Sequence, residues 1–279
     1  MKSSRVFLVS GFVLFALIYL MSRGDNRGES IGTLRIFCAA NMRKSVEELA
    51  KEYYKKYKVT IEADYDGSGT LLARLQLAEK HADLYLAADD FYILKAREKG
   101  LVAESLPVAY MRPVIAVQKG NPKGISKVED LLGEGLKVAV CNPEQAAVGR
   151  SARRALEGSD HWDRLVKVAE VMKPKVTDLA NDVKLGTVDA AIVWDSTVAM
   201  PKFSEDLVAV PVPELDTDPN LVSIAILRSS PSSASASRFA RYMAARDKGL
   251  KAFGKYLRPV EGDVWEDPLQ MPANIIQDL

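Results

Sequence analysis

Three segments of this chain join the end of an apolar strand to a polar turn and the start of a helix, a pattern that can bind an anion. They cover residues 34–41, 65–70 and 141–149. The first N–H groups of a helix have no acceptor within the helix, and the helix dipole adds positive potential there. A small anion is the ligand that such N–H groups suit.

Four residues could contact such an anion, and the first three of them lie in these segments. Asn41 is a favourable N-cap residue and could also line a cleft. Ser68 offers a hydroxyl between two glycines of the turn 66–69, and glycine lets the backbone approach a ligand closely. Val148 could present its N–H at the third helix start, and Trp194, which ends an apolar run, can donate through its indole N–H. For each of them a purely structural role, as a cap, turn, loop or core residue, is the alternative.

Signatures of catalysis are missing from the sequence, which contains no GxSxG, HExxH or CxxC motif. The adjacent carboxylates Asp89 and Asp90 would point in opposite directions on an extended segment, so they favour a helix start over acid–base chemistry. The two histidines, His81 and His161, have no neighbours at metal-ligand spacing. We therefore expect a binding protein without cofactor or bound metal cation rather than an enzyme. A hydrolase that uses Ser68 is the alternative.

Charge and cysteine content limit the function further. The 279 residues carry 38 basic and 37 acidic side chains, a formal net charge of +1, whereas nucleic-acid-binding proteins usually show a strong basic excess. We therefore expect no nucleic-acid partner. Cys38 and Cys141 fall at the ends of two expected strands, where they are either small buried residues or a disulfide pair.

The N-terminus has the features of an export signal. Lys2 and Arg5 precede an apolar run over 6–21, and a polar spacer follows. The run is slightly short for a membrane span of roughly 20 residues, but no small-x-small cleavage site follows it. We expect residues 1–32 to form an uncleaved anchor and spacer, with a cleaved signal peptide as the alternative. Both place the rest of the chain in the periplasm or on the outer face of the cytoplasmic membrane.

Short apolar segments alternate with amphipathic ones along the rest of the chain, which predicts an α/β fold. Strands are expected over 34–39, 59–65, 84–87, 114–118, 137–140, 166–171, 190–193, 207–210 and 222–226, and helices over 42–57, 71–79, 150–157, 178–185, 237–246 and 248–257. The pattern restarts in the middle of the chain, so we expect two lobes, each a mostly parallel sheet flanked by helices. Lobe 1 would comprise 33–112 and 222–279, and lobe 2 would comprise 113–221, with the ligand site in the cleft between them.

Five ordered segments resemble those of periplasmic molybdate-binding proteins, the solute-binding components of ABC importers. They are LRIFCAAN from Leu34, DGSGTLLAR from Asp66, ADLYLAAD from Ala82, VAVCNPE from Val138 and AIVWDS from Ala191. The resemblance covers roughly residues 34–257. It implies the type II periplasmic-binding fold, in which two lobes close over a tetrahedral oxyanion held by N–H groups and hydroxyls without a cation.

By position, the resemblance implies ligand contacts at Asn41, Ser68, Val148, Val176 and Trp194. It also implies molybdate or tungstate as the ligand, an ABC permease as the partner and a monomeric protein. Many members have Ser or Thr in place of Asn41 and Tyr in place of Trp194, so the size and donor positions of the pocket would differ here. Alternatives are another anion, such as sulfate, a phosphonate or a small organic acid, and a membrane sensor domain that has lost its ligand.

Overall fold

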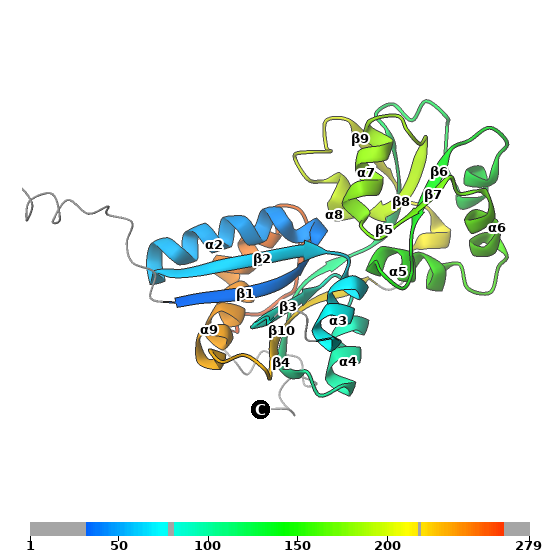
Figure 1. Ribbon diagram of the computed structural model, residues 1–279. Helices are drawn as coiled ribbons and strands as arrows, with labels where there is room; N and C mark the ends of the chain where they lie inside the picture. The colour runs from blue at the N-terminus through cyan, green and yellow to red at the C-terminus, as the bar shows by residue number, and fades with distance from the viewer. Residues whose placement is uncertain (1–31, 78–80, 217–218, 265–279) are drawn as a thin grey trace, which may run out of the picture.

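The computed structural model describes residues 32–77, 81–216 and 219–264. Within these ranges the chain forms two lobes, each built on its own sheet and covered by helices (Figure 1). Lobe 1 contains a six-stranded sheet in the order β11-β4-β10-β3-β1-β2, and lobe 2 contains a five-stranded sheet in the order β7-β6-β8-β5-β9. The predicted two-lobe α/β architecture is confirmed.

The strands divide between the lobes by their position in the chain. The strands of lobe 1 are β1 (Gly32–Ala39), β2 (Val59–Asp66), β3 (Leu84–Ala87), β4 (Val102–Met111), β10 (Asn220–Leu227) and β11 (Arg258–Pro259). The strands of lobe 2 are β5 (Pro113–Gln118), β6 (Val138–Cys141), β7 (Val171–Lys173), β8 (Ala190–Trp194) and β9 (Leu207–Val210). The chain therefore crosses from lobe 1 to lobe 2 between β4 and β5 and returns between β9 and β10.

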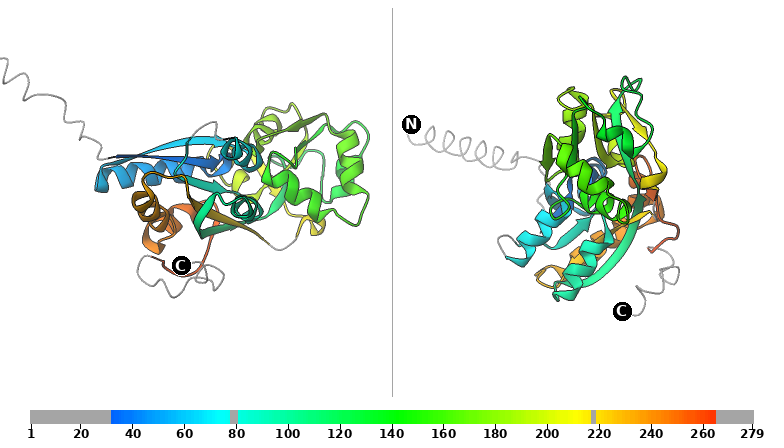
Figure 2. Two further views of the ribbon diagram at one scale, coloured as in Figure 1. Left: turned by 60° about the horizontal axis from the view of Figure 1, so that its bottom comes forward. Right: turned by 90° about the vertical axis from the view of Figure 1, so that its right-hand side faces the viewer.

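Helices cover both sheets, as the two further views in Figure 2 show. Lobe 1 contains η1 (Ala40–Met42), α2 (Arg43–Tyr57), α3 (Ser68–Gln76), α4 (Asp90–Glu98), α9 (Ser233–Met243), η4 (Arg246–Leu250) and α10 (Lys251–Phe253). Lobe 2 contains η2 (Val128–Leu132), α5 (Ala147–Ala155), α6 (His161–Val168), α7 (Val176–Lys184), α8 (Asp195–Val198) and η3 (Pro213–Leu215). Helices α3, α5 and α7 each begin just after the carboxyl end of a strand, which places their first turns near the other lobe.

Most strands of each sheet run in one direction, as predicted, but both sheets also contain antiparallel pairs. Strand β1 is parallel to β2 and β3, and β6 is parallel to β7 and β8. In contrast, β10 runs antiparallel to β3 and β4, and β5 runs antiparallel to β8 and β9. The chain enters β5 and β10 directly after it crosses between the lobes. Because of this direction of entry, each of the two strands runs antiparallel to the strands beside it.

Two elements differ from the sequence predictions. Half of the expected strand over 166–171 is helix: α6 buries Trp162 and Leu165 on one face and leaves Val166 and Val168 exposed, and β7 begins only at residue 171. Strand β4 was not predicted, and it contains Pro107, a residue that is unusual in an interior strand. The register of β4 against β10 shifts beside Pro107, and such an irregularity is where a strand tolerates proline.

Arg112 ties the two crossings together. Its guanidinium Nη1 lies 2.5 Å from Oδ1 of Asp216, which precedes the return crossing. Its backbone N–H donates to Oδ1 of Asp195 at the start of α8, over 3.2 Å. The first crossing is thus connected by side chains to lobe 2 and to the segment that leads back to lobe 1.

Both cysteines are free and buried, Cys38 in β1 and Cys141 in β6. Burial raises the pKa of both thiols. The disulfide alternative is not realised, and each cysteine acts as a small apolar residue in the core of its own lobe.

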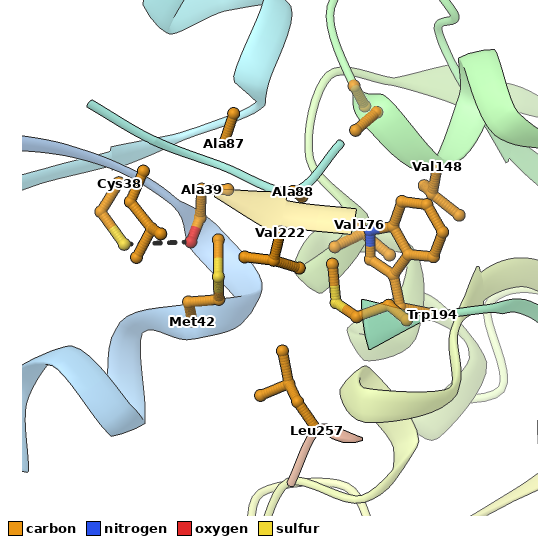
Figure 3. Packing of buried hydrophobic residues seen from close by; sticks show 14 of the residues in the cluster. Cys38, Ala39, Met42, Ala87, Ala88, Val148, Val176, Trp194, Val222 and Leu257 are labelled. Atoms are coloured by element: carbon orange, nitrogen blue, oxygen red, sulfur yellow. Dashed lines mark hydrogen bonds between the residues drawn. The ribbon is translucent and has the colours of Figure 1, made fainter. Parts of the chain in front are cut away.

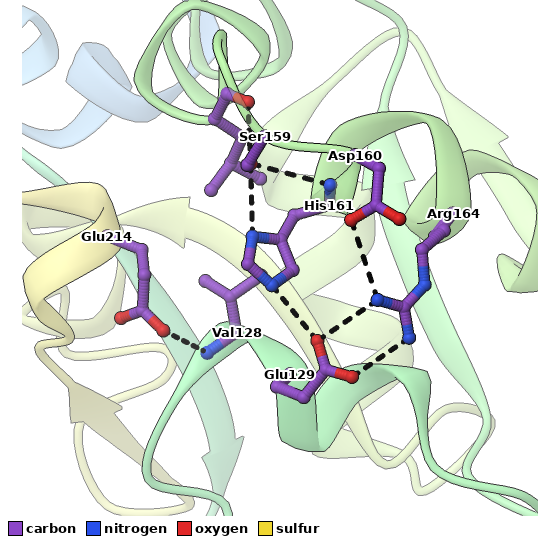
Figure 4. A network of polar contacts seen from close by, with 8 residues as sticks. Val128, Glu129, Ser159, Asp160, His161, Arg164 and Glu214 are labelled. Carbon is purple, nitrogen blue, oxygen red and sulfur yellow. Dashed lines mark hydrogen bonds and ion pairs between the residues drawn. The ribbon is translucent and has the colours of Figure 1, made fainter.

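The two histidines contact carboxylates outside the interlobe region. His161 in α6 contacts Glu129 of η2, with Nε2 2.9 Å from Oε2, and Arg164 contacts the same carboxylate at 2.8 Å (Figure 4). These contacts connect α6 to η2 on lobe 2. Nε2 of His81 lies 3.5 Å from the carboxylate of Asp83 in lobe 1.

The expected signal or anchor, 6–21, lies outside the described residues. Among the helices in the described ranges, none is both long enough and apolar enough to cross a membrane.

Candidate functional site

A small cavity lies between the lobes, and all five site residues expected from the sequence line it. We call it the inner cavity. Its volume is about 20 Å³, which exceeds the roughly 10–15 Å³ needed by one water molecule but suits only a small ion. Lobe 1 lines it with Ala39, Ala40, Asn41, Asp66, Gly67, Ser68 and Ala88, and lobe 2 lines it with Ala146, Ala147, Val148, Lys175, Val176 and Trp194.

Ser68 is the first residue of α3 and is buried, so the whole residue faces the protein interior. Its Oγ accepts a hydrogen bond from the backbone N–H of Ala88 over 3.1 Å. A hydroxyl has one donor hydrogen beside its acceptor lone pairs, so this bond leaves the hydrogen available. The carbonyl of Ser68 accepts from the hydroxyl of Tyr85 at 2.6 Å, which fixes the start of the helix. Ser68 can therefore donate into the inner cavity.

Val148 and Val176 bring two more helix starts to the inner cavity. Val148 is the second residue of α5 and Val176 the first residue of α7, and both side chains are buried. Their backbone N–H groups belong to the first helical turn, which has no acceptor within the helix. Within the described part of the chain no other acceptor meets them. Both helices begin two to three residues before the expected positions, and this earlier start puts these N–H groups in the first turn.

Trp194 ends β8 and is almost fully buried, with 1% of its surface exposed. Figure 3 shows its ring beside Val148 and Val176, with the indole nitrogen on the side of Val176. Trp194 forms no hydrogen bond through its side chain with any described residue. The indole N–H is thus a further donor at the inner cavity. The ring itself packs against apolar side chains, as the ring of a core tryptophan does.

Asn41 lines the inner cavity but does not cap a helix, so that part of its prediction is wrong. It lies inside the short turn η1, and no side chain caps either η1 or α2. Its Nδ2 instead donates to Sδ of Met111 over 3.0 Å and to Oγ of Ser196 over 3.4 Å. Because Ser196 belongs to α8 of lobe 2, Asn41 connects the two lobes at the wall of the cavity.

Two charged residues at the cavity were not identified from the sequence. Asp66 is buried, accepts from the N–H of Gly67 over 2.9 Å and pairs with Arg74 over 2.8 Å, so its negative charge is compensated. Lys175 immediately precedes α7 and lines the cavity from lobe 2. The resemblance had implied a site without a cation. The only sequence signal for Lys175 is its position next to Val176.

The glycines of the turn 66–69 allow the lobes to touch. The N–H groups of Gly69 and Thr70 in lobe 1 donate to the carbonyl of Gln145 in lobe 2, over 2.9 and 3.3 Å. A Cβ on Gly67 would lie 2.3 Å from that carbonyl oxygen, and one on Gly69 would lie 1.9 Å from the carbonyl oxygen of Glu144. The sequence suggested a close approach of a ligand, whereas the structure shows a close approach of the opposite lobe's backbone.

An ion pair also joins the lobes beside the cavity. Nη1 of Arg150 in α5 lies 2.9 Å from Oδ2 of Asp89, and both side chains are largely buried. The guanidinium of Arg150 also lies over the ring of Phe91, 3.5 Å from its centroid. Asp89 accepts from the N–H of Phe91 as the N-cap of α4, which confirms the prediction that the Asp89-Asp90 pair marks a helix start.

We expect Arg150→Met to weaken binding of a ligand between the lobes by about 2 kcal/mol, because loss of Arg150 leaves the Asp89 carboxylate buried without its partner where the lobes are in contact. Isothermal titration calorimetry measures the change. Arg153→Met is the matched control, since Arg153 lies on the same helix but pairs with Glu144 on the exposed surface of the same lobe. Surface pairs contribute little, so equal losses in the two variants would contradict a role for Arg150 in closure.

The two lobes, the cavity between them and the three helix starts that line it define a ligand-binding protein of the type II periplasmic-binding fold. The family model of bacterial extracellular solute-binding proteins matches residues 34–256, so the chain belongs to this family. Members bind a solute outside the cytoplasm for ABC transport.

Two curated relatives support this assignment. A protein of Haemophilus influenzae described only as a binding protein is 27% identical over 201 residues, which are 71% of this chain and 79% of that protein. The molybdate-binding protein ModA of Escherichia coli is 28% identical over 143 residues, which are 48% of this chain and 54% of ModA.

Solved structures show the same fold with different ligands. The periplasmic molybdate-binding protein of Azotobacter vinelandii superimposes with a TM-score of 0.68 at 17% identity, over 82% of this chain and all of that one. The sulfate-binding protein SubI of Mycobacterium tuberculosis superimposes with a TM-score of 0.72 at 17% identity, over 82% of this chain and 88% of that one. At this level of identity the comparison supports the fold and leaves the ligand open.

Proposed function

We propose that this chain captures a tetrahedral oxyanion outside the cytoplasm, with molybdate or tungstate as the first candidate, and presents it to an ABC permease. The observation that carries the proposal is the convergence of donors without protein acceptors, from the starts of α3, α5 and α7 and from Trp194, on one cavity of about 20 Å³. The names of the relatives from E. coli and A. vinelandii support molybdate.

Binding would couple to closure of the lobes. We propose that residues 33–112 with 222–279, and residues 113–221, move as two bodies about the crossings near Arg112 and Asp216. Ser68 comes from lobe 1, whereas Val148, Val176 and Trp194 come from lobe 2, so only the closed form offers all the donors at once. An anion therefore binds the closed form better and shifts the population toward it. The permease would recognise the closed form.

Calorimetric titration of the purified protein with molybdate, tungstate and sulfate, each at the same ionic strength, tests the ligand. We expect heat of binding with molybdate and tungstate and much weaker binding of sulfate. Sulfate is the second candidate because a solved protein of the same fold is a sulfate-binding protein. Binding of sulfate alone would reject molybdate, and no response to any oxyanion would reject the proposal and favour a sensor domain.

We expect Ser68→Ala to weaken oxyanion binding by about 1–3 kcal/mol, the usual cost of leaving a buried hydrogen-bonding group without its partner. The control is Ser45→Ala, because Ser45 is also buried and its hydroxyl contacts the carbonyl of Ala252 on the other side of lobe 1. Calorimetry on both variants measures the change. An affinity of Ser68→Ala equal to that of Ser45→Ala would remove the Ser68 hydroxyl from the site.

We propose a binding role rather than hydrolysis for Ser68. Its Oγ contacts the N–H of Ala88, and neither histidine is near it, since His81 contacts Asp83 and His161 contacts Glu129. A serine nucleophile needs an adjacent base that can take its proton. Activated esters should therefore not be turned over.

Two further features belong to the proposal. Residues 6–21 would act as an uncleaved anchor that keeps a monomeric binding domain beside its permease. A cleaved signal peptide would instead release the domain, and the mass of the mature protein distinguishes the two.

A further inference from the structure

A second and much larger cavity lies next to the inner cavity. Its volume is about 490 Å³, within the range of pockets that hold organic ligands. We call it the outer cleft. Ala40 and Lys175 line both spaces, so the two are neighbours. Lobe 1 lines the outer cleft with Ala40, Arg43, Lys44, Glu47 and Tyr65, and lobe 2 lines it with Lys175, Thr177, Asp178, Asn181, Met200, Pro201, Lys202 and Phe203.

Positive charge exceeds negative charge in the outer cleft, which has four cationic side chains and the two carboxylates Glu47 and Asp178. Two of the cations are already engaged on lobe 1. Arg43 pairs with Glu47 over 3.4 Å and lies over the ring of Tyr65 at 3.9 Å. Lys44 pairs with Glu48 over 3.7 Å. These pairs leave the excess charge on lobe 2.

Lys175 and Lys202 carry that excess. Neither ammonium forms an ion pair within the described part of the chain. Because Glu47 pairs with Arg43, Asp178 is the other carboxylate that lines the cleft. Lys175 stands at the boundary with the inner cavity, whereas Lys202 lines the outer cleft only. Apolar surface from Met200 and Phe203 lies beside them. The ammonium of Lys202 lies over the ring of Phe203, 5.2 Å from its centroid. The cleft thus combines ammonium groups that have no carboxylate partner with an apolar wall, which suits a short organic chain that ends in an acid.

We propose that the ligand spans both spaces: a tetrahedral oxyanion group occupies the inner cavity, and an organic substituent with a second acidic group extends into the outer cleft toward Lys175 and Lys202. The ligand class is a small phosphorylated or phosphono carboxylic acid. The inference rests on the proposed function, because it needs an oxyanion in the inner cavity. A bare oxyanion fills only the inner cavity and binds less tightly.

The test compares three probes by calorimetry: molybdate, propylphosphonate and 3-phosphonopropionate, of which the last two differ in a terminal carboxylate. For the unmodified protein we expect 3-phosphonopropionate to bind at least tenfold more tightly than propylphosphonate. Lys202→Met should reduce this preference to less than threefold and leave the affinity for molybdate unchanged. Lys167→Met, which removes the same charge from an exposed position on α6, should leave the preference intact.

The outcomes separate this inference from the proposed function. If molybdate binds but 3-phosphonopropionate has no advantage over propylphosphonate, the inference is overturned and the proposed function stands. If Lys202→Met and Lys167→Met reduce the preference equally, the lysines act only through long-range charge, and the second subsite is rejected. If none of the three probes binds, both the inference and the proposed function fail.

Discussion

Gly69→Ala is expected to reduce oxyanion affinity by at least a hundredfold. The added Cβ would lie 1.9 Å from the carbonyl oxygen of Glu144 in the opposite lobe. The Cβ is held rigidly by the backbone of Gly69 and its partner is a main-chain carbonyl, so they can separate only if the lobes do. An open protein loses donors from one lobe, and two lost hydrogen bonds at about 2 kcal/mol each, the middle of the usual range, exceed the roughly 2.7 kcal/mol that a hundredfold change requires.

The variant should fold normally, because alanine is a better helix former than glycine and Gly69 lies within α3. Calorimetry with molybdate measures the loss of affinity, and small-angle X-ray scattering with and without molybdate measures the loss of closure. Gly32→Ala is the control, since a Cβ there meets nothing within 4 Å. A Gly69→Ala protein that binds and compacts like Gly32→Ala would show that this interlobe contact is not part of the bound form.

Asn41→Asp is expected to reduce oxyanion affinity even more, by about a thousandfold. The substitution keeps the shape of the side chain but places a negative charge at the wall of the inner cavity. Two like charges about 4 Å apart repel by about 4 kcal/mol at the effective dielectric constant of a protein site. The variant also loses the donor that reaches Met111 and Ser196.

A pH series gives this prediction a second measurement. Burial would raise the pKa of the introduced carboxyl, so lowering the pH should protonate it and restore part of the affinity for a bound oxyanion that itself stays ionised over the same pH range. Asn121→Asp adds the same charge to a turn of lobe 2 outside the site and is the control. If both variants bind alike at neutral pH, Asn41 contributes a structural contact only.

Much of the candidate site could be predicted because its donors are local features of the chain. The N–H groups of Ser68, Val148 and Val176 lie in the first turns of their helices. The first turn of any helix has no preceding carbonyl within the helix, so these groups have no acceptor there. The positions of the helix starts follow from where the apolar strands end. Expected boundaries were wrong by two or three residues, yet all five residues line one cavity.

The errors arose where a distant partner decides the outcome. Asn41 has the chemistry of an N-cap, but its amide donates to Met111 and Ser196, which are 70 and 155 residues away in the chain. The antiparallel direction of β5 and β10, which the sequence left unspecified, depends on how the chain crosses between the lobes. Neither the contacts of Asn41 nor the direction of these strands can be inferred from the neighbouring sequence.

The sequence by itself determined the alternation of strands and helices, the family to which the chain is similar, and the approximate positions of the helix starts. These properties depend on residues within one helical turn or one strand. Only the tertiary structure decided that the donors meet in one cavity, that the glycines of the turn 66–69 accommodate the backbone of the other lobe, and that Lys175 and Lys202 share a cleft with Tyr65. Those relations are contacts between two lobes, and their energies depend on distances through space that no local pattern encodes.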